Sequence, residues 1–294
     1  MLVSVIIVTR NRLQSLSRCL QSVTMQSYKD LELIVVDNAS SDDTIQLIES
    51  TYPSVILLQQ AINTGVPEGR NIGIRRAKGE ICVCLDDDAE FIDNGSIQKC
   101  VDYFGKGTKL GCLSIRVLDE HNRIVTKLIP RRDRKIFNED MQGALFSGTA
   151  FAVRRSAFME VGEFWQDLNL YFGEDADLSY RLLDKGYSIL QTPYITVRHY
   201  MSPAERQKSR RLYYGTRNAP WLALRSLPWY SVIGLTILSW GYFFLIAVCE
   251  RQLITYFRAI IASVKHMPAV YRIRKPVSKH TQQLLWQYSG LILI

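Results

Sequence analysis

The sequence predicts an α/β fold, in which a mostly parallel sheet carries helices on both faces and a basic, apolar, helical C-terminal region follows it. Three observations predict this fold. In the first hundred residues, short β-branched apolar runs alternate with stretches that have apolar residues at helical spacing. Polar residues follow the end of each strand expected there. The last third of the chain is basic and includes a long uncharged segment.

The first hundred residues contain consecutive strand–helix–strand units. Strands that are separated by single helices lie parallel, and right-handed connections bring their carboxyl ends to one edge of the sheet. Ligands of open α/β sheets bind at that edge. The expected strands are residues 3–9, 31–36, 55–58 and 81–85, and the expected helices are residues 13–25, 42–51 (capped by Ser40 or Ser41) and 67–77.

Residues 105–173 mix strands and loops, and the pattern becomes regular again near their end. We expect a strand at residues 148–154, a short helix at residues 177–185 and two short strands at residues 187–191 and 194–199. The composition changes after residue 203. A domain of residues 1–203 is therefore expected to precede a helical C-terminal region of residues 204–294.

Charge is distributed unevenly along the chain. Residues 198–294 carry 14 basic and 2 acidic residues, a net charge of +12, whereas the preceding part carries 22 basic and 26 acidic residues, a net charge of −4. A basic region of this kind favours an anionic partner, either lipid headgroups or nucleic acid. The uncharged segment inside it, described next, favours lipid, and we expect no nucleic-acid partner.

Residues 226–249 contain no charged side chain and are long enough to cross a bilayer, for which about 20 apolar residues suffice. Trp229 and Trp240 are typical of a membrane interface. Because both flanks are basic, we expect the segment to lie on, or re-enter, the cytoplasmic leaflet. A true span, and a buried core segment or oligomer contact, are the alternatives.

The start of the chain and the cysteines favour a reducing compartment. Residues 1–9 are apolar but lack the basic start and small-residue cleavage site of a secretory signal, so we expect a buried strand there. The six cysteines form no CxxC pair, and their spacing fits neither a zinc site nor a disulfide framework. Buried free thiols in the cytoplasm are expected at Cys19, Cys82, Cys84, Cys100, Cys112 and Cys249.

Asp86, Asp87 and Asp88 directly follow the buried strand at residues 81–85. Three adjacent carboxylates repel one another unless a cation or solvent is present. Mg²⁺ and Mn²⁺ prefer carboxylate oxygens together with substrate phosphates. A solvated acidic turn is the alternative, but the wholly apolar strand before the cluster favours a metal site.

A second acidic pair, Glu174 and Asp175, precedes the helix expected at residues 177–185. Carboxylates at a helix N-terminus are common as simple caps, and alone the pair favours that interpretation. The alternative is a site that this pair shares with other residues. The chain favours it because it also has the cluster Asp86–Asp88, and His199 at the end of a short strand. The loop NTGVPEGRNIG, which contains Asn63, Gly65, Arg70 and Asn71, could contact a phosphate or base through its backbone, although it matches no Walker or GxGxxG motif.

Together these segments resemble family 2 glycosyltransferases with the GT-A fold. The segments that carry the resemblance are VSVIIVTRNR, LELIVVDNASSDDT, NTGVPEGRNIGI, GEICVCLDDDAEF and GEDADLSYRLLDKGY. It covers residues 2–200 and is closest to bacterial rhamnosyl- and galactofuranosyltransferases of cell-surface polysaccharides. It implies a nucleotide-binding half at residues 1–104 and an acceptor-binding half at residues 105–203.

The resemblance also implies roles for single residues. Asp175 would be the catalytic base, with Glu174 beside it, and Trp165 would shape the acceptor side. The lead-in GEFWQDLNLYFGED departs from the usual GFDE-type pattern, which implies an unusual acceptor pocket. Asp86, Asp88 and His199 would hold Mn²⁺ or Mg²⁺, Asp37 would hydrogen-bond the pyrimidine ring, and the nucleotide sugar would contact Thr9, Asn11, Asp37, Asn63, Gly65, Arg70, Asn71, Asp86 and Asp87.

The expected activity is an inverting, metal-dependent transfer of a sugar from a UDP- or dTDP-linked donor to an acceptor hydroxyl. The acceptor would be a lipid-linked or polysaccharide glycan, and the protein would lie peripherally on the cytoplasmic face of the cell membrane. The oligomeric state stays open, with a homodimer through the C-terminal region as one arrangement.

Two other function classes make different demands on the sequence. A sugar-nucleotide nucleotidyltransferase should carry a GxGTR-like loop where this chain has TRNR, and an NAD-binding oxidoreductase lacks support for the same reason. A non-catalytic glycan-binding relative should have lost the cluster Asp86–Asp88 or Asp175, and both are intact.

Overall fold

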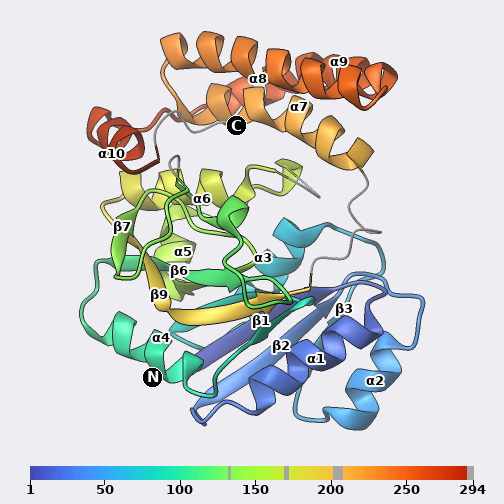
Figure 1. Ribbon diagram of the computed structural model, residues 1–294, viewed down its shortest axis with the longest axis vertical. Coiled ribbons are helices and arrows are strands. Elements are labelled where there is room, and N and C mark those ends of the chain that lie inside the picture. The colour runs from blue at the N-terminus through green and yellow to red at the C-terminus, as the bar shows by residue number, and fades with distance from the viewer. Residues whose placement is uncertain (132–133, 169–171, 201–207, 290–294) are drawn as a thin grey trace.

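The computed structural model describes residues 1–131, 134–168, 172–200 and 208–289. These residues form a nine-stranded sheet between two layers of helices, and the C-terminal helices make a further layer beyond one of them (Figure 1). The strand order is β3-β2-β1-β4-β8-β6-β9-β5, and β7 pairs with β9.

The first half of the sheet is parallel, as the sequence predicts. Strand β1 lies between β2 and β4, and β3 flanks β2, all in parallel register. Each strand is continuous and apolar because both of its faces are covered by helices. The bounds are β1 Val3–Thr9, β2 Leu31–Asp37, β3 Ile56–Gln59 and β4 Ile81–Asp86.

The second half makes the sheet mixed. Strand β8 runs antiparallel to both β4 and β6, whereas β9 runs parallel to β6 and antiparallel to β5 and β7. The bounds are β5 Ala89–Phe91, β6 Leu110–Leu118, β7 Met141–Gly143, β8 Ala150–Arg154 and β9 Ser188–His199.

The two short strands expected at residues 187–191 and 194–199 are one strand, β9. The interruption in the pattern is a register shift, since β6 pairs first with Thr192 and then with Thr196. Pro193 lies in the skipped segment, and proline cannot donate a ladder hydrogen bond. A bulge therefore replaces the predicted break, and the strand continues to His199.

Two apolar cores fill the space between the sheet and its helices. On β1, Val3, Val5 and Ile7 pack on one side and Ile6 on the other, as the two-residue period of a strand requires. Helices α1, α2 and α4 cover the first face, and α3, α5 and α6 cover the second (Figure 1). The bounds are α1 Leu13–Thr24, α2 Thr44–Thr51, α3 Val66–Arg76, α4 Ser96–Gly105, α5 Arg155–Val161 and α6 Glu174–Asp184, with 3₁₀ turns η1 Thr126–Leu128 and η2 Gln166–Leu168.

Helix α3 lies unusually close to β1. A Cβ atom on Gly69 would be 2.6 Å from Val8 Cγ1, and one on Gly73 would be 2.4 Å from Ile6 Cγ2. These glycines therefore permit the contact, because any side chain at either position would collide with the strand. The close approach brings Arg70, which follows Gly69, beneath the carboxyl edge of the sheet.

The helix expected at residues 177–185 begins earlier, at Glu174. Gly173 has a φ of 105°, a left-handed conformation that suits glycine, and α6 starts directly after it. Glu174, Asp175 and Asp177 thus lie in the first turn, where the helix dipole favours negative charge.

The C-terminal region is helical, as predicted. Helices α7, α8 and α9 form a layer that packs on α6 through α7, and α10 lies beside them (Figure 1). Gly215 of α7 admits the ring of Phe243, since a Cβ there would lie 2.3 Å from Phe243 Cζ. The bounds are α7 Lys208–Ser226, α8 Trp229–Cys249, α9 Leu253–Arg272 and α10 Lys279–Ser289.

Helix α8 is long and apolar enough to cross a membrane, and only 28% of its most apolar window is buried within the protein. The alternative that residues 226–249 form a buried core segment is therefore wrong. The expectation of six buried thiols is also wrong at one position, because Cys249 at the end of α8 is exposed while the other five cysteines are buried.

Candidate active site at the carboxyl edge of the sheet

The parallel register brings three strand ends to one edge. Thr9 at the end of β1 lies opposite Asp37 at the end of β2, and Val8 lies opposite Asp86 at the end of β4. The polar residues that follow each strand in the sequence are thus neighbours in the fold, as expected for a parallel sheet.

Asp86, Asp88 and His199 form a group in which one ligand atom from each lies within 4.8 Å of the others. The antiparallel pair β5–β9 places His199 opposite Ala89, next to Asp88. His199 Nε2 is 2.9 Å from Asp88 Oδ1. Carboxylate oxygens and an imidazole nitrogen are metal ligands, and the spacing of their ligand atoms fits one divalent ion.

Arg12 neutralises part of this acidic cluster. Its Nη1 is 2.9 Å from both Asp87 Oδ1 and Asp88 Oδ2. Burial alone would raise the pKa of Asp88, but its hydrogen bond with His199 and the charges of His199 and Arg12 hold it below the usual value. Arg12 is not among the predicted site residues, although basic residues follow the first strand in the sequence.

Asp87 is buried and is not part of the metal-ligand group. It is 5% exposed, and its Oδ2 accepts a hydrogen bond of 2.8 Å from the Thr9 hydroxyl. Burial raises the pKa of Asp87 to about 7, against the opposing charge of Arg12. Thr9 and Asp87, both predicted to contact the nucleotide sugar, therefore satisfy each other here and hold β1 to the acidic cluster.

Arg70 contacts the metal-ligand group directly, and its charge acts on the second acidic pair, Glu174 and Asp175. Its Nη2 donates to Asp86 Oδ1 at 2.8 Å and to the Gly148 carbonyl at 2.5 Å. The guanidinium lies over the rings of Phe151 and Phe164, 5.4 and 5.9 Å from their centroids. Arg70 is 3% exposed, so this cation is buried beside Asp86 and the two rings.

Glu174 and Asp175 lie at the other side of Arg70. Burial raises the pKa of Glu174 to about 7, Asp175 adds to this rise and Arg70 opposes it. Burial also raises the pKa of Asp175, whereas hydrogen bonds from backbone N–H groups, including those of Ala176 and Gly148, lower it. A carboxylate whose pKa is raised toward neutrality is a better proton acceptor than an ordinary one.

Asp37 presents an unused acceptor. Its side chain is 1% exposed, and its Oδ2 accepts a hydrogen bond from the Ser40 N–H at 3.0 Å. Its Oδ1 is buried and has no hydrogen-bond partner among the described residues. Asn11 fixes the surrounding loop, because its N–H donates to Ser40 Oγ and its Oδ1 accepts from the Ser41 N–H.

Three other predicted residues make contacts that stabilise loops. Asn63 Oδ1 accepts from the N–H of Gly65, which has a φ of 84° and precedes α3. The Asn71 amide donates to the Phe164 carbonyl at 3.0 Å and accepts from its N–H at 2.9 Å, so it ties α3 to that loop. Trp165, predicted on the acceptor side, is 7% exposed and packs against Trp221 of α7.

Known proteins resemble this chain in sequence and in fold. The model of the glycosyl transferase family 2 matches residues 4–162. The chain is 29% identical over 182 residues to a GalNAc(5)-diNAcBac-PP-undecaprenol β-1,3-glucosyltransferase of Campylobacter jejuni. The aligned segment covers 60% of this chain and 57% of that relative.

Two solved structures share the fold at low sequence identity. A mannosyltransferase from Pyrobaculum calidifontis, in complex with GDP-Man and Mn²⁺, aligns with a TM-score of 0.61 and 20% identity over 98% of this chain and 81% of that one. GalNAc-T7 with UDP, GalNAc and Mn²⁺ aligns with a TM-score of 0.63 and 21% identity over 78% of this chain and 49% of that one.

Proposed function

Because the chain belongs to glycosyl transferase family 2, we propose that it moves a sugar from a nucleotide-diphosphate donor to an acceptor hydroxyl, with inversion at the anomeric carbon. One observation carries the proposal: a group fit for a divalent ion contacts the buried Arg70, whose charge also acts on a second acidic pair. Neither a nucleotidyltransferase nor a non-catalytic relative is favoured by any contact described above.

The residues divide the chemistry between them. Asp86, Asp88 and His199 would hold Mn²⁺ or Mg²⁺, which neutralises charge on the leaving diphosphate when bound. Asp175 takes the proton of the acceptor hydroxyl as the oxygen attacks the anomeric carbon from the face opposite the diphosphate. Arg70 donates to the metal ligand Asp86, and its charge favours the ionised form of Asp175, the form that can accept a proton during a single in-line displacement.

We further propose a UDP- or dTDP-linked donor. The buried Asp37 Oδ1 can accept the ring N–H that uracil and thymine share. The Pyrobaculum enzyme binds GDP-Man, so the fold itself does not fix the base. The presence of His199 after the pair Glu174–Asp175 supports a place near the rhamnosyl- and galactofuranosyltransferases.

A panel of nucleotide sugars tests the donor. We expect UDP- or dTDP-sugars, but not GDP-sugars, to raise the melting temperature in the presence of Mn²⁺ or Mg²⁺. A ligand at 100 times its Kd stabilises the folded state by about 2.7 kcal/mol, which a thermal shift assay detects readily. Slow metal-dependent hydrolysis of the same donor should accompany the shift. Absence of both effects across the panel would contradict the proposed function.

The acceptor is proposed to be a lipid-linked or polysaccharide glycan, met at the cytoplasmic face of the membrane. The Campylobacter relative is named for an undecaprenol-linked saccharide. In this chain, α8 and α9 expose a continuous series of large apolar side chains with basic residues around them. The most exposed aliphatic side chains are Ile233, Ile237 and Leu245 on α8 and Ile254 and Ile261 on α9.

Membrane attachment through this face can be measured by co-sedimentation with vesicles that contain anionic lipid. The double variant Ile237→Asp/Ile261→Asp should lower binding at least about 10-fold, since each buried isoleucine contributes about 1.5–3 kcal/mol. Ile136→Asp, which changes an exposed isoleucine of the catalytic domain, is the matched control and should still bind. Unchanged vesicle binding, together with dissociation of a dimer in the double variant, would instead favour a homodimer through the C-terminal region.

A further inference from the structure

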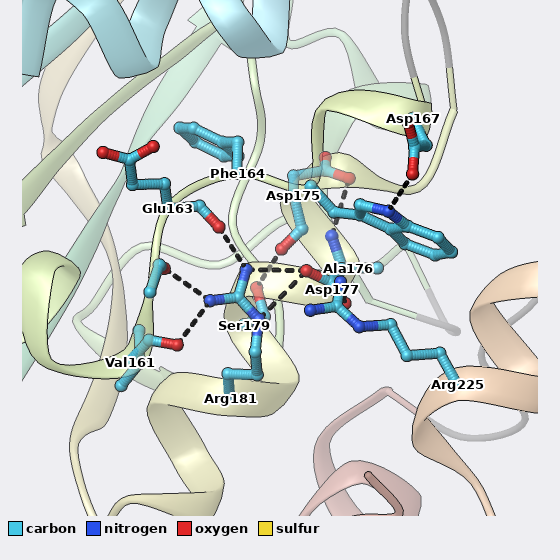
Figure 2. Close-up of polar contacts among 12 residues, drawn as sticks. Val161, Glu163, Phe164, Asp167, Asp175, Ala176, Asp177, Ser179, Arg181 and Arg225 are labelled. Atoms are coloured by element: carbon cyan, nitrogen blue, oxygen red, sulfur yellow. Dashed lines mark hydrogen bonds and ion pairs between the residues drawn. The ribbon is translucent and has the colours of Figure 1, made fainter. Parts of the chain in front are cut away.

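Asp177, two residues after Asp175, is a fully buried carboxylate between two arginines (Figure 2). Its Oδ2 is 2.6 Å from Arg181 Nη2 and accepts from Arg181 Nε at 3.0 Å. Its Oδ1 is 2.6 Å from Arg225 Nη1. A buried charge is stable only when it is paired and hydrogen-bonded, and Asp177 meets this condition through both oxygens.

The two arginines come from different parts of the fold. Arg181 belongs to α6 itself and also donates to the Val161 and Glu163 carbonyls, so it fixes the loop after α5. Arg225 belongs to α7, the first helix of the C-terminal layer. The contact between Arg225 and Asp177 therefore joins the C-terminal layer directly to the first turn of α6.

Arg225 is itself held by aromatic packing. Its guanidinium lies 4.6 Å from the centroid of a Trp165 ring, and the Trp165 indole donates to Asp167 Oδ2 at 3.0 Å. Stacking on tryptophan and a charge-assisted hydrogen bond at the same time fix the plane of the guanidinium. These two contacts hold the Arg225 guanidinium between Trp165 and Asp177.

The position of Asp175 depends on the same helical turn. Its Oδ1 accepts from the N–H of Ala176 at 2.8 Å, and the Ser179 hydroxyl donates to its backbone carbonyl at 2.7 Å. The backbone of this turn therefore holds the Asp175 carboxylate. The same turn carries Asp177, whose side chain pairs with Arg225. A shift of this turn would move the carboxylate relative to Arg70 and the metal ligands.

We propose that Arg225 is a positioning residue, which aligns Asp175 for proton transfer through Asp177, so that docking of the C-terminal helices is a condition for sugar transfer. This inference rests on the proposed function. The C-terminal helices would then have two roles. They would present an apolar face to the membrane, and they would support the carboxylate of Asp175. Donor binding does not depend on it, because Asp37 and the metal ligands lie on the strand ends.

The test compares Arg225→Met with Arg217→Met. Arg217 is a matched control, since it also lies on α7, also stacks on a tryptophan (4.5 Å from Trp221) and also contacts the loop at Asp167, but touches no carboxylate of α6. We expect Arg225→Met to lower kcat about 10- to 100-fold, the effect of a small misplacement of a catalytic group, with the donor KM unchanged. Arg217→Met should keep kcat within about threefold of the original protein.

Hydrogen exchange gives a second readout that needs no activity. Amide hydrogens in the first turn of α6 should exchange faster in Arg225→Met than in Arg217→Met. An unchanged kcat and unchanged exchange in a folded Arg225→Met would overturn the inference, as would equal losses in the two variants. If the unsubstituted protein transfers no sugar, the proposed function fails, but the exchange comparison still decides whether Arg225 fixes the turn. Arg225→Gln, which keeps a donor to Asp177, replaces Arg225→Met if that variant does not fold.

Discussion

Replacement of Asp175 by asparagine is expected to lower kcat for sugar transfer about 10²- to 10⁴-fold, the usual contribution of a general base. Asparagine has the same shape and can still accept the hydrogen bond from the Ala176 N–H. It cannot take up the proton of the acceptor hydroxyl. Donor binding, measured by the thermal shift with donor and Mn²⁺, should stay unchanged because Asp37 and the metal ligands are intact.

Two further variants make this result specific. Asp184→Asn carries the same chemical change at the other end of α6, where the carboxylate accepts hydrogen bonds from Ser278 and Thr281, and should retain most of the activity. Glu174→Gln tests the neighbouring carboxylate, whose pKa is raised to about 7. If transfer survives Asp175→Asn but is lost in Glu174→Gln, Glu174 is the base and the assignment to Asp175 is wrong.

Removal of the Asp88 carboxylate is expected to have the second large effect. Asp88→Ala should weaken Mn²⁺ binding at least about 100-fold and lower kcat/KM about 10²- to 10³-fold, because the charge on the leaving diphosphate then lacks its counter-ion. The measurement is a Mn²⁺ titration in the presence of the nucleoside diphosphate, followed by the electron paramagnetic resonance of free Mn²⁺.

The contacts of Asp88 predict how its variant differs from others nearby. Asp88 also pairs with Arg12 and His199, and Arg12 keeps its second contact, with Asp87, when Asp88 is removed. Asp93→Ala removes an exposed carboxylate from the same segment, one that pairs with Lys99, and should leave Mn²⁺ binding as it was. Equal Mn²⁺ affinity in Asp88→Ala and the unsubstituted protein would rule out a metal site at Asp88.

The sequence predicted those parts of the site that depend on strand ends. Asp86, Asp88 and Asp37 could be placed together because each follows a buried strand of a parallel unit. The place of His199 near Asp86 and Asp88 was implied by the family resemblance and is consistent with the described geometry. The position of His199 depends on the β5–β9 pairing. No local sequence pattern predicts a pairing between segments that are about a hundred residues apart.

Contacts between distant side chains could not be predicted. Arg12 meets Asp87 across 75 residues and Arg225 meets Asp177 across 48 residues, and both contacts arise only when the layers have packed. The break expected within residues 187–199 failed for a local reason, because a proline that interrupts a hydrogen-bond ladder ends a strand in one context and causes a bulge in another. Trp165 likewise carries no sequence signal that it packs under α7.

The exposed thiol of Cys249 can be labelled covalently with a probe. The other five cysteines are buried, and burial raises the pKa of their thiols, to about 12 for Cys100, so they do not form reactive thiolates at neutral pH. A maleimide dye therefore labels a single position, at the end of the apolar helix α8. The emission colour of an environment-sensitive dye at that position tests the proposed membrane attachment, because it shifts when the helix end enters a lipid layer.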